Sequence, residues 1–181
     1  TSLTGTSTFA SVALVCTQPL FVAFFSYVLF RERTPRRALP GALLPWYASH
    51  ARDLPWRRDR EPYHVWLSEI MLQQTRVEAA RGYYLRFLDA FPTLRDLAAA
   101  DEARLLKLWE GLGYYSRARN LQRAARVLCD EYGGVFPDTR EALERLPGVG
   151  PYTAGAVASI CFDAPEPAVD GNVLRVLSRV T

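Results

Sequence analysis

Two acidic residues of this sequence stand in contrasting surroundings, and such a pair suits the cleavage of a glycosidic bond. Glu69 lies within VWLSEIMLQQT (65–75), an otherwise apolar helical stretch. Burial there would disfavour the ionised carboxylate and raise its pKa, as a general acid working near neutral pH requires. The alternative is a glutamate on the exposed face of its helix, which is the common position for this residue type.

Asp170 lies within PAVDGNVLRVL (167–177), just before an apolar helical stripe that starts at Val173. The spacing predicts an N-cap, a role that Asp performs well. The N–H groups of a helix N-terminus also favour an ionised carboxylate, which is suited to stabilising a cation. One protonated and one ionised carboxyl group together form the pattern of glycoside hydrolysis.

The segment LPGVGPYTAGA (146–156) has the features of a turn that binds a phosphate through its backbone. Gly148 and Gly150 permit a positive φ and the close approach of another backbone, and a helix begins directly afterwards. Backbone N–H groups at such a turn bind DNA phosphates without basic side chains. The segment therefore indicates a helix-hairpin-helix, with an ordinary connection between two helices as the alternative.

Aromatic residues fall into two predicted groups. Four of them stand in loops or at helix starts, where they are available to stack on bases or to wedge into a duplex: Trp56, Tyr114, Tyr115 and Tyr152. Three others are predicted core residues: Phe87, Phe91 and Trp109.

Helical periodicity dominates the sequence from residue 43 onward. Apolar residues recur at i, i+3, i+4 and i+7 in three stretches, each of which would present one stripe to a core. Asp101 is a predicted N-cap, and Asp138 with Glu141 has the spacing of a capping box. We predict an all-α domain of roughly seven or eight helices over 43–181. The three stripes are Tyr84/Phe87/Leu88/Phe91, Leu121/Ala124/Ala125/Leu128 and Val173/Val176/Leu177/Val180.

Composition narrows the classes of protein that the sequence can be. The 181 residues are 49% apolar with a formal net charge of +3, which excludes a disordered chain and is weak evidence for a nucleic-acid partner. The three cysteines, Cys16, Cys129 and Cys161, form no disulfide framework and no metal-ligand spacing.

The first thirty residues carry no charge, and Arg31 is the first charged residue. Residues 9–30 form an apolar run long enough to span a bilayer, and a basic segment follows it. The stretch resembles a late transmembrane helix of a drug/metabolite-type transporter, with a buried helix as the alternative. We therefore divide the chain into a membrane-like leader with a basic linker (1–37) and a catalytic core (38–181), and membrane contact would be through residues 9–30.

Several motifs in one order resemble the helix-hairpin-helix DNA glycosylases, specifically the MutY-type adenine DNA glycosylases. Endonuclease III-type relatives carry a lysine where this chain has Tyr152, Gln where it has Glu69, and Thr-His where it has Gly171-Asn172. Without the lysine, no Schiff base and no β-elimination are expected, so the resemblance implies a monofunctional glycosylase. The motifs are RDLPWR (52–57), PYHVWLSEIMLQQT (62–75), LWEGLGYYSRARNL (108–121), LPGVGPYTAGA (146–156) and VDGNV (169–173).

The resemblance implies base excision repair of adenine mispaired with 8-oxoguanine or guanine in duplex DNA, after the adenine has been flipped into a pocket. Glu69 would protonate adenine N7 and later serve as base for water, and Asp170 would stabilise the oxocarbenium-like sugar or attack it. Tyr152 and Asn172 would support these steps beside the sugar. The implied adenine pocket comprises Arg52, Leu54, Trp56 and Arg57, and the implied DNA-binding residues are Gln73, Gln74, Tyr114, Gly148, Val149, Gly150 and Thr153. Among these, the resemblance implies that Gln74 and Tyr114 wedge into the duplex near the mispair.

The chain departs from the family pattern after the VDGNV helix. The family binds a 4Fe-4S cluster through four cysteines that would lie beyond Thr181, so we expect no cofactor or metal to be bound by the residues present. The C-terminal domain that reads 8-oxoguanine is also expected to be absent. We therefore expect an incomplete glycosylase fold with an extra apolar N-terminal helix, poor stability and weak activity.

The expected location and partners follow from the same resemblance. We expect a monomer on double-stranded DNA in a bacterial cytoplasm, with a possible membrane association of the N-terminal segment. Two other functions remain open from the residues: a non-catalytic helix-hairpin-helix DNA-binding module, and a membrane protein with a soluble helical tail. The carboxyl pair discriminates against the first, because a bare binding module has no need of it.

Overall fold

A computed structural model describes residue 45 and residues 47–180 of the chain. The predicted membrane-like leader with its basic linker (1–37) lies outside these residues, and no helix in the described part is long and apolar enough to cross a membrane. The described elements are helical, as predicted. They are η1 (Pro55–Arg57), α4 (Pro62–Leu72), α5 (Val77–Ala90), α6 (Leu94–Ala99), α7 (Glu102–Trp109), α8 (Ser116–Glu131), α9 (Arg140–Glu144), α10 (Pro151–Phe162) and α11 (Gly171–Val180).

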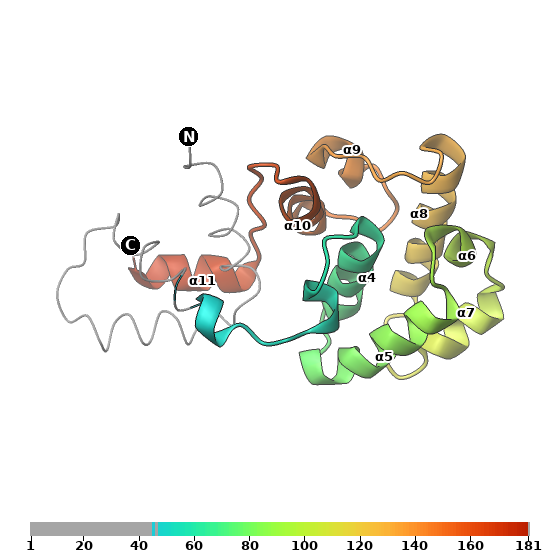
Figure 1. Ribbon diagram of the computed structural model, residues 1–181, viewed down its shortest axis with the longest axis horizontal. Helices are drawn as coiled ribbons and strands as arrows, with labels where there is room; N and C mark the ends of the chain where they lie inside the picture. The colour runs from blue at the N-terminus through green and yellow to red at the C-terminus, as the bar shows by residue number, and fades with distance from the viewer. Residues whose placement is uncertain (1–44, 46, 181) are drawn as a thin grey trace.

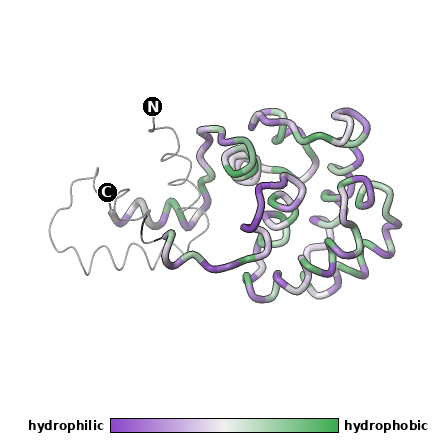
Figure 2. Tube along the Cα trace, viewed as in Figure 1, coloured by the Kyte–Doolittle hydropathy of each residue, from purple (hydrophilic) through white to green (hydrophobic). Residues whose placement is uncertain are grey.

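Helix α4 lies at the centre of the bundle and packs against α5, α8 and α10 (Figure 1). It is buried along nearly its whole length, because an almost wholly apolar helix has no face to offer to water. Helix α10 is its principal partner, with every residue from Thr153 to Ser159 buried, and Figure 2 shows the apolar character of this helix. The two helices that carry Glu69 and Tyr152 are therefore fixed by the core.

The predicted apolar stripes form the rest of the core. Tyr84, Phe87 and Phe91 are buried on and just after α5, and Phe87 meets both Phe91 and Trp109 edge to face. The stripe on α8 is buried completely. Val173 of the third stripe is buried on α11, while the side chains of the other three members lie outside the described part of the chain.

Helix starts follow the capping predictions in one case and depart from them in another. Asp101 caps α7 by accepting a hydrogen bond from the backbone N–H of Arg104 at 3.1 Å. The capping box at Asp138 is wrong, because α9 begins one residue later with Thr139 at its N-cap and no side-chain cap bond. The burial of Leu143 in the core fixes the position of this short helix in place of its cap.

Candidate active site

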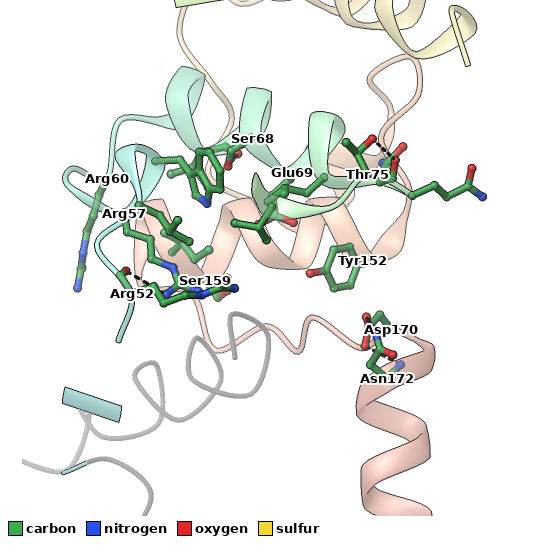
Figure 3. A pocket seen from close by; sticks show the side chains of 18 of the residues that line it. Arg52, Arg57, Arg60, Ser68, Glu69, Thr75, Tyr152, Ser159, Asp170 and Asn172 are labelled. Carbon is green, nitrogen blue, oxygen red and sulfur yellow. Dashed lines mark hydrogen bonds between the residues drawn. The ribbon is translucent and has the colours of Figure 1, made fainter. Parts of the chain in front are cut away.

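An open cavity of about 1100 Å3 lies between α4, α10 and the segment that leads into α11 (Figure 3). Its volume is sufficient for a flipped nucleoside. The cavity brings together both predicted catalytic carboxyl groups, Tyr152 and Asn172, and the four predicted adenine-pocket residues. Residues separated by more than 100 positions in the sequence thus share one site.

Glu69 is the buried acid of this site. It is 8% exposed on α4, and burial raises its pKa to about 7. A hydrogen bond with Tyr152 and the charge of Arg57 oppose this increase in the pKa, while the charge of Asp170 adds to it. A carboxyl group in this state is protonated in a large fraction of molecules near neutral pH, which is what a general acid requires.

Asp170 caps α11, as the sequence predicts. One carboxylate oxygen accepts the backbone N–H groups of Val173 at 2.8 Å and Asn172 at 3.0 Å. The other oxygen accepts the side-chain amide of Asn172 at 2.9 Å. Asn172 thus holds the carboxylate from both its backbone and its side chain, and the carboxylate keeps a fixed orientation toward the cavity (Figure 3).

The connector of residues 163–170 carries Asp170 from the end of α10 to the cavity. A Cβ added at Gly155 on α10 would lie 2.5 Å from the backbone oxygen of Pro167, so the connector packs directly on this glycine. Ala168 is buried beside this contact. Two ion pairs hold the rest of the connector, Arg60–Asp163 at 2.9 Å and Arg140–Glu166 at 3.3 Å.

The four predicted adenine-pocket residues lie on and before η1 and line the cavity. The prediction that Trp56 is available to stack on bases is wrong. Trp56 is 7% exposed and meets Tyr84 edge to face at 5.3 Å between ring centroids, so it forms part of the wall and has no face free to stack on a duplex. The apolar surroundings of α4 and α5 bury it despite its position outside the long helices.

The predicted helix-hairpin-helix turn connects α9 to α10. Gly148 has a φ of 77°, and an added Cβ there would lie 2.7 Å from Cβ of Asn120, so both conformation and space require glycine. The side chains of Val149 and Thr153 are buried, and Thr153 accepts a hydrogen bond from Gln73. Neither side chain is therefore available to DNA.

Gln74 and Tyr114, the predicted wedge residues, lie on two separate turns beside the cavity. Both side chains are exposed, Tyr114 by 64%. Both residues also have a positive φ, 59° for Gln74 and 49° for Tyr114, which is uncommon for residues other than glycine. Such conformations tend to occur where the surrounding structure enforces them for function.

Two residues that the sequence analysis did not single out contribute to this arrangement. Gly155 permits the contact with the connector, and Arg117 joins the two turns that carry the wedge residues. Both residues lie inside sequence motifs that resemble those of the glycosylases, so their neighbours indicated a functional region. Their own roles depend on contacts with distant segments, which spacing does not reveal.

The described residues do not fit an iron-sulfur cluster. They contain no group of three or more His, Cys, Asp or Glu side chains placed to hold a metal. Cys129 and Cys161, both half-buried, cannot supply the four thiolates that a 4Fe-4S cluster takes. Burial also raises the pKa of Cys161 to about 12, which disfavours the thiolate that binds metals.

Comparison with known families and sequences gives a consistent result. Residues 67–181 match the family model described as HhH-GPD superfamily base excision DNA repair protein. The chain is 52% identical over 164 residues to the adenine DNA glycosylase of Homo sapiens, which covers 86% of this chain and 30% of the human protein. It is 43% identical over 138 residues to that of Buchnera aphidicola subsp. Baizongia pistaciae, covering 76% of this chain and 39% of the relative. The chain thus spans about a third of the length of these curated relatives.

Solved structures confirm the predicted fold. A thermostable thymine-DNA glycosylase superposes with a TM-score of 0.73 at 32% identity, over 78% of this chain and 66% of that one. A non-covalent endonuclease III–DNA complex superposes with a TM-score of 0.66 at 27% identity, over 79% of this chain and 67% of the other. The resemblance carried by the sequence motifs is therefore also present in the arrangement of the helices.

Proposed function

The chain belongs to the HhH-GPD superfamily of base excision DNA repair proteins, and from that premise we propose that it hydrolyses the N-glycosidic bond of adenine mispaired with 8-oxoguanine or guanine in duplex DNA. The observation that carries the proposal is the cavity shared by the carboxyl groups of Glu69 and Asp170, of which only that of Glu69 is deeply buried. Residues 38–181 form the proposed catalytic core.

Binding begins in this proposal with the backbone of the turn at 148–150, which takes a phosphate at the N-terminus of α10. The adenine then leaves the base stack, because its reacting atoms are inaccessible inside a duplex. The exposed side chains of Gln74 and Tyr114 fill the space that it leaves. The flipped base enters the cavity between η1 and α4, lined there by Arg52, Leu54, Trp56 and Arg57.

Protonation by Glu69 starts the proposed chemistry. The proton moves to adenine N7, and the bond between N9 and the sugar C1′ breaks with its electron pair going to the base. Asp170 stabilises the positive charge that develops on the sugar. Water then adds to C1′ and gives its proton to the Glu69 carboxylate, so the products are free adenine and an abasic sugar.

Tyr152 and Asn172 act as supporting residues in this scheme. Tyr152 shares a hydrogen bond with Glu69, and Asn172 holds Asp170 through its amide. Tyr152 occupies the position of the lysine in endonuclease III-type enzymes and cannot form a Schiff base. The proposed reaction therefore ends at the abasic site, without strand cleavage.

The proposed partner is double-stranded DNA carrying an adenine mispair. One copy of the chain supplies every proposed site residue, so we propose a monomer. The substrate implies a DNA-associated location, which in a bacterial cell is the cytoplasm.

Single-turnover release of adenine from an adenine:8-oxoguanine duplex tests the proposal directly. We expect release by the wild-type chain, and a loss of roughly 100- to 10,000-fold in Glu69→Gln with unchanged affinity for the duplex. Glu131→Gln is a matched control, because Glu131 is exposed at the end of α8. A wild-type chain that binds the duplex and releases no adenine would instead be a non-catalytic DNA-binding module.

A further inference from the structure

Arg117 joins two segments that the sequence separates by about forty residues. It is the second residue of α8, and one terminal nitrogen of its guanidinium donates to the backbone oxygens of Ile70 at 3.0 Å and Met71 at 3.2 Å, and to that of Gln73. These oxygens belong to the C-terminal end of α4. Helix ends leave such carbonyl groups without partners inside the helix, so a cation there is favourable.

The other terminal nitrogen of Arg117 binds the turn between α7 and α8. It donates to the backbone oxygens of Leu112 at 3.0 Å and Gly113 at 3.3 Å. The guanidinium also lies over two rings, 5.5 Å from the centroid of Trp109 and 5.7 Å from that of Tyr114. One planar group thus connects the end of α4 with the turn that carries Tyr114.

Two of the bound carbonyl groups immediately precede the two wedge residues. The oxygen of Gln73 belongs to the peptide plane from which φ of Gln74 is measured, and the oxygen of Gly113 has the same relation to Tyr114. Fixing these planes restricts the two positive φ angles, 59° and 49°. Arg117 is therefore placed to hold both left-handed conformations at once.

We propose that Arg117 is a positioning residue that fixes Gln74 and Tyr114 relative to each other, so that their side chains enter the duplex together. The proposal rests on the proposed function, because it takes these two side chains as the wedge. Arg117 itself does not touch the reacting atoms in this proposal. It acts through the main chain of the two turns.

The chemistry of the contacts requires arginine. Each hydrogen bond of Arg117 in the described part of the chain ends on a main-chain oxygen, so no acidic side chain there pairs with it. Burial lowers its pKa, which reflects the cost of placing a cation here. A planar fork reaches two sets of acceptors and stacks on rings, whereas a lysine ammonium is a compact point donor that cannot span both.

The test compares Arg117→Lys with Arg126→Lys. Arg126 lies on the same helix and also donates to a backbone oxygen, that of Ala98 at 3.0 Å, away from the two turns. The probe is a duplex with 2-aminopurine opposite 8-oxoguanine, whose fluorescence rises when the base unstacks. It is measured at saturating protein in a Glu69→Gln background, where excision is blocked, and thermal melting reports the global fold.

We expect Arg117→Lys to melt cooperatively and bind the duplex, yet to lose most of the fluorescence increase. With Glu69 present, its adenine excision should be roughly 10- to 100-fold slower than that of the wild type. Arg126→Lys should match the wild type in both measurements.

A folded Arg117→Lys chain with wild-type fluorescence would overturn the proposal. Loss of the cooperative melting transition would also overturn it, because Arg117 would then maintain the fold as a whole. Failure of the proposed function is a separate result: the wild-type chain would release no adenine, while the fluorescence comparison would still decide the role of Arg117.

Discussion

The two carboxyl groups of the cavity are held in different ways. Glu69 projects from α4, whose residues are buried on all sides and whose position depends on the whole core. Asp170 is half-exposed at the end of the 163–170 connector, where it caps its own helix. The connector depends on a few contacts: the close approach to Gly155 and two ion pairs.

This difference separates chemistry from geometry. Burial determines the protonation of Glu69, so a change at Glu69 alters the chemistry and leaves the geometry intact. The few contacts of the connector determine the position of Asp170, so a change in the connector alters the geometry and leaves both carboxyl groups in the chain. Substitutions that change only one of the two therefore separate the contribution of chemistry from that of geometry.

Apart from Glu69→Gln, Asp170→Asn should cause the largest loss of excision activity. Asn is also a good N-cap and keeps an oxygen for the backbone N–H of Val173, so thermal stability should change little. The charge that stabilises the sugar cation disappears, and excision should fall by roughly 100- to 1,000-fold. Single-turnover rates and melting temperatures of the same preparations measure the two effects. An excision rate within threefold of the wild type would show that the charge is not used.

Glu69→Gln should stabilise the protein at alkaline pH, although it slows excision. The pKa of Glu69 is about 7 in the folded chain against an ordinary value of 4.5, so the folded state holds its proton more tightly. Wild-type stability should therefore fall as the pH rises from about 4.5 through 7, by about 3 kcal/mol in total. The Gln side chain of Glu69→Gln does not titrate, so the stability of this variant should lack this pH dependence.

Urea unfolding at pH 5 and pH 8 measures this difference. The wild type should lose stability between the two pH values relative to Glu69→Gln, and Glu131→Gln should behave as the wild type does. Equal changes in the wild type and in Glu69→Gln would contradict the buried, protonated state of this side chain.

Gly155→Ala should displace the connector without touching either carboxyl group. The new Cβ would lie 2.5 Å from the backbone oxygen of Pro167, so the connector must shift and carry Asp170 with it. We expect excision to fall by roughly tenfold or more, with duplex affinity retained. Gly82→Ala on α5 is the matched control, because its Cβ would meet only Arg86 at an ordinary 3.5 Å. Equal excision rates in the two variants would show that the contact of the connector with Gly155 does not position Asp170.

The same contrast explains which features the sequence could predict. The helices of the bundle follow from local periodicity, and Glu69 from the apolar residues on either side of it. The Asp170 cap was predictable because its partners lie two and three residues away. Local rules failed where burial overrides them, as at Asp138, whose cap gives way to the packing of α9, and at Trp56, which the core encloses.

The remaining site features depend on contacts between distant segments. To predict the role of Gly155, one must know that Pro167 packs back onto α10. To predict the role of Arg117, one must know that the end of α4 lies beside the start of α8. Neither a glycine nor an arginine predicts such a contact by its residue type alone. A glycine in a helix and an arginine at a helix start have many ordinary explanations, and only the folded arrangement distinguishes them.

Tyr152→Phe should give the smallest effect, a shift in the pH profile of excision. Wild-type excision should fall about tenfold per pH unit above pH 7, as Glu69 loses the proton that it donates. The hydrogen bond with Tyr152 lowers the pKa of Glu69, so its removal should move this limb to higher pH. Asp170→Asn removes a charge that raises the same pKa and should move the limb the other way. Single-turnover rates between pH 5.5 and 9 compare the three chains, and coincident limbs would mean that Glu69 is not the titrating acid.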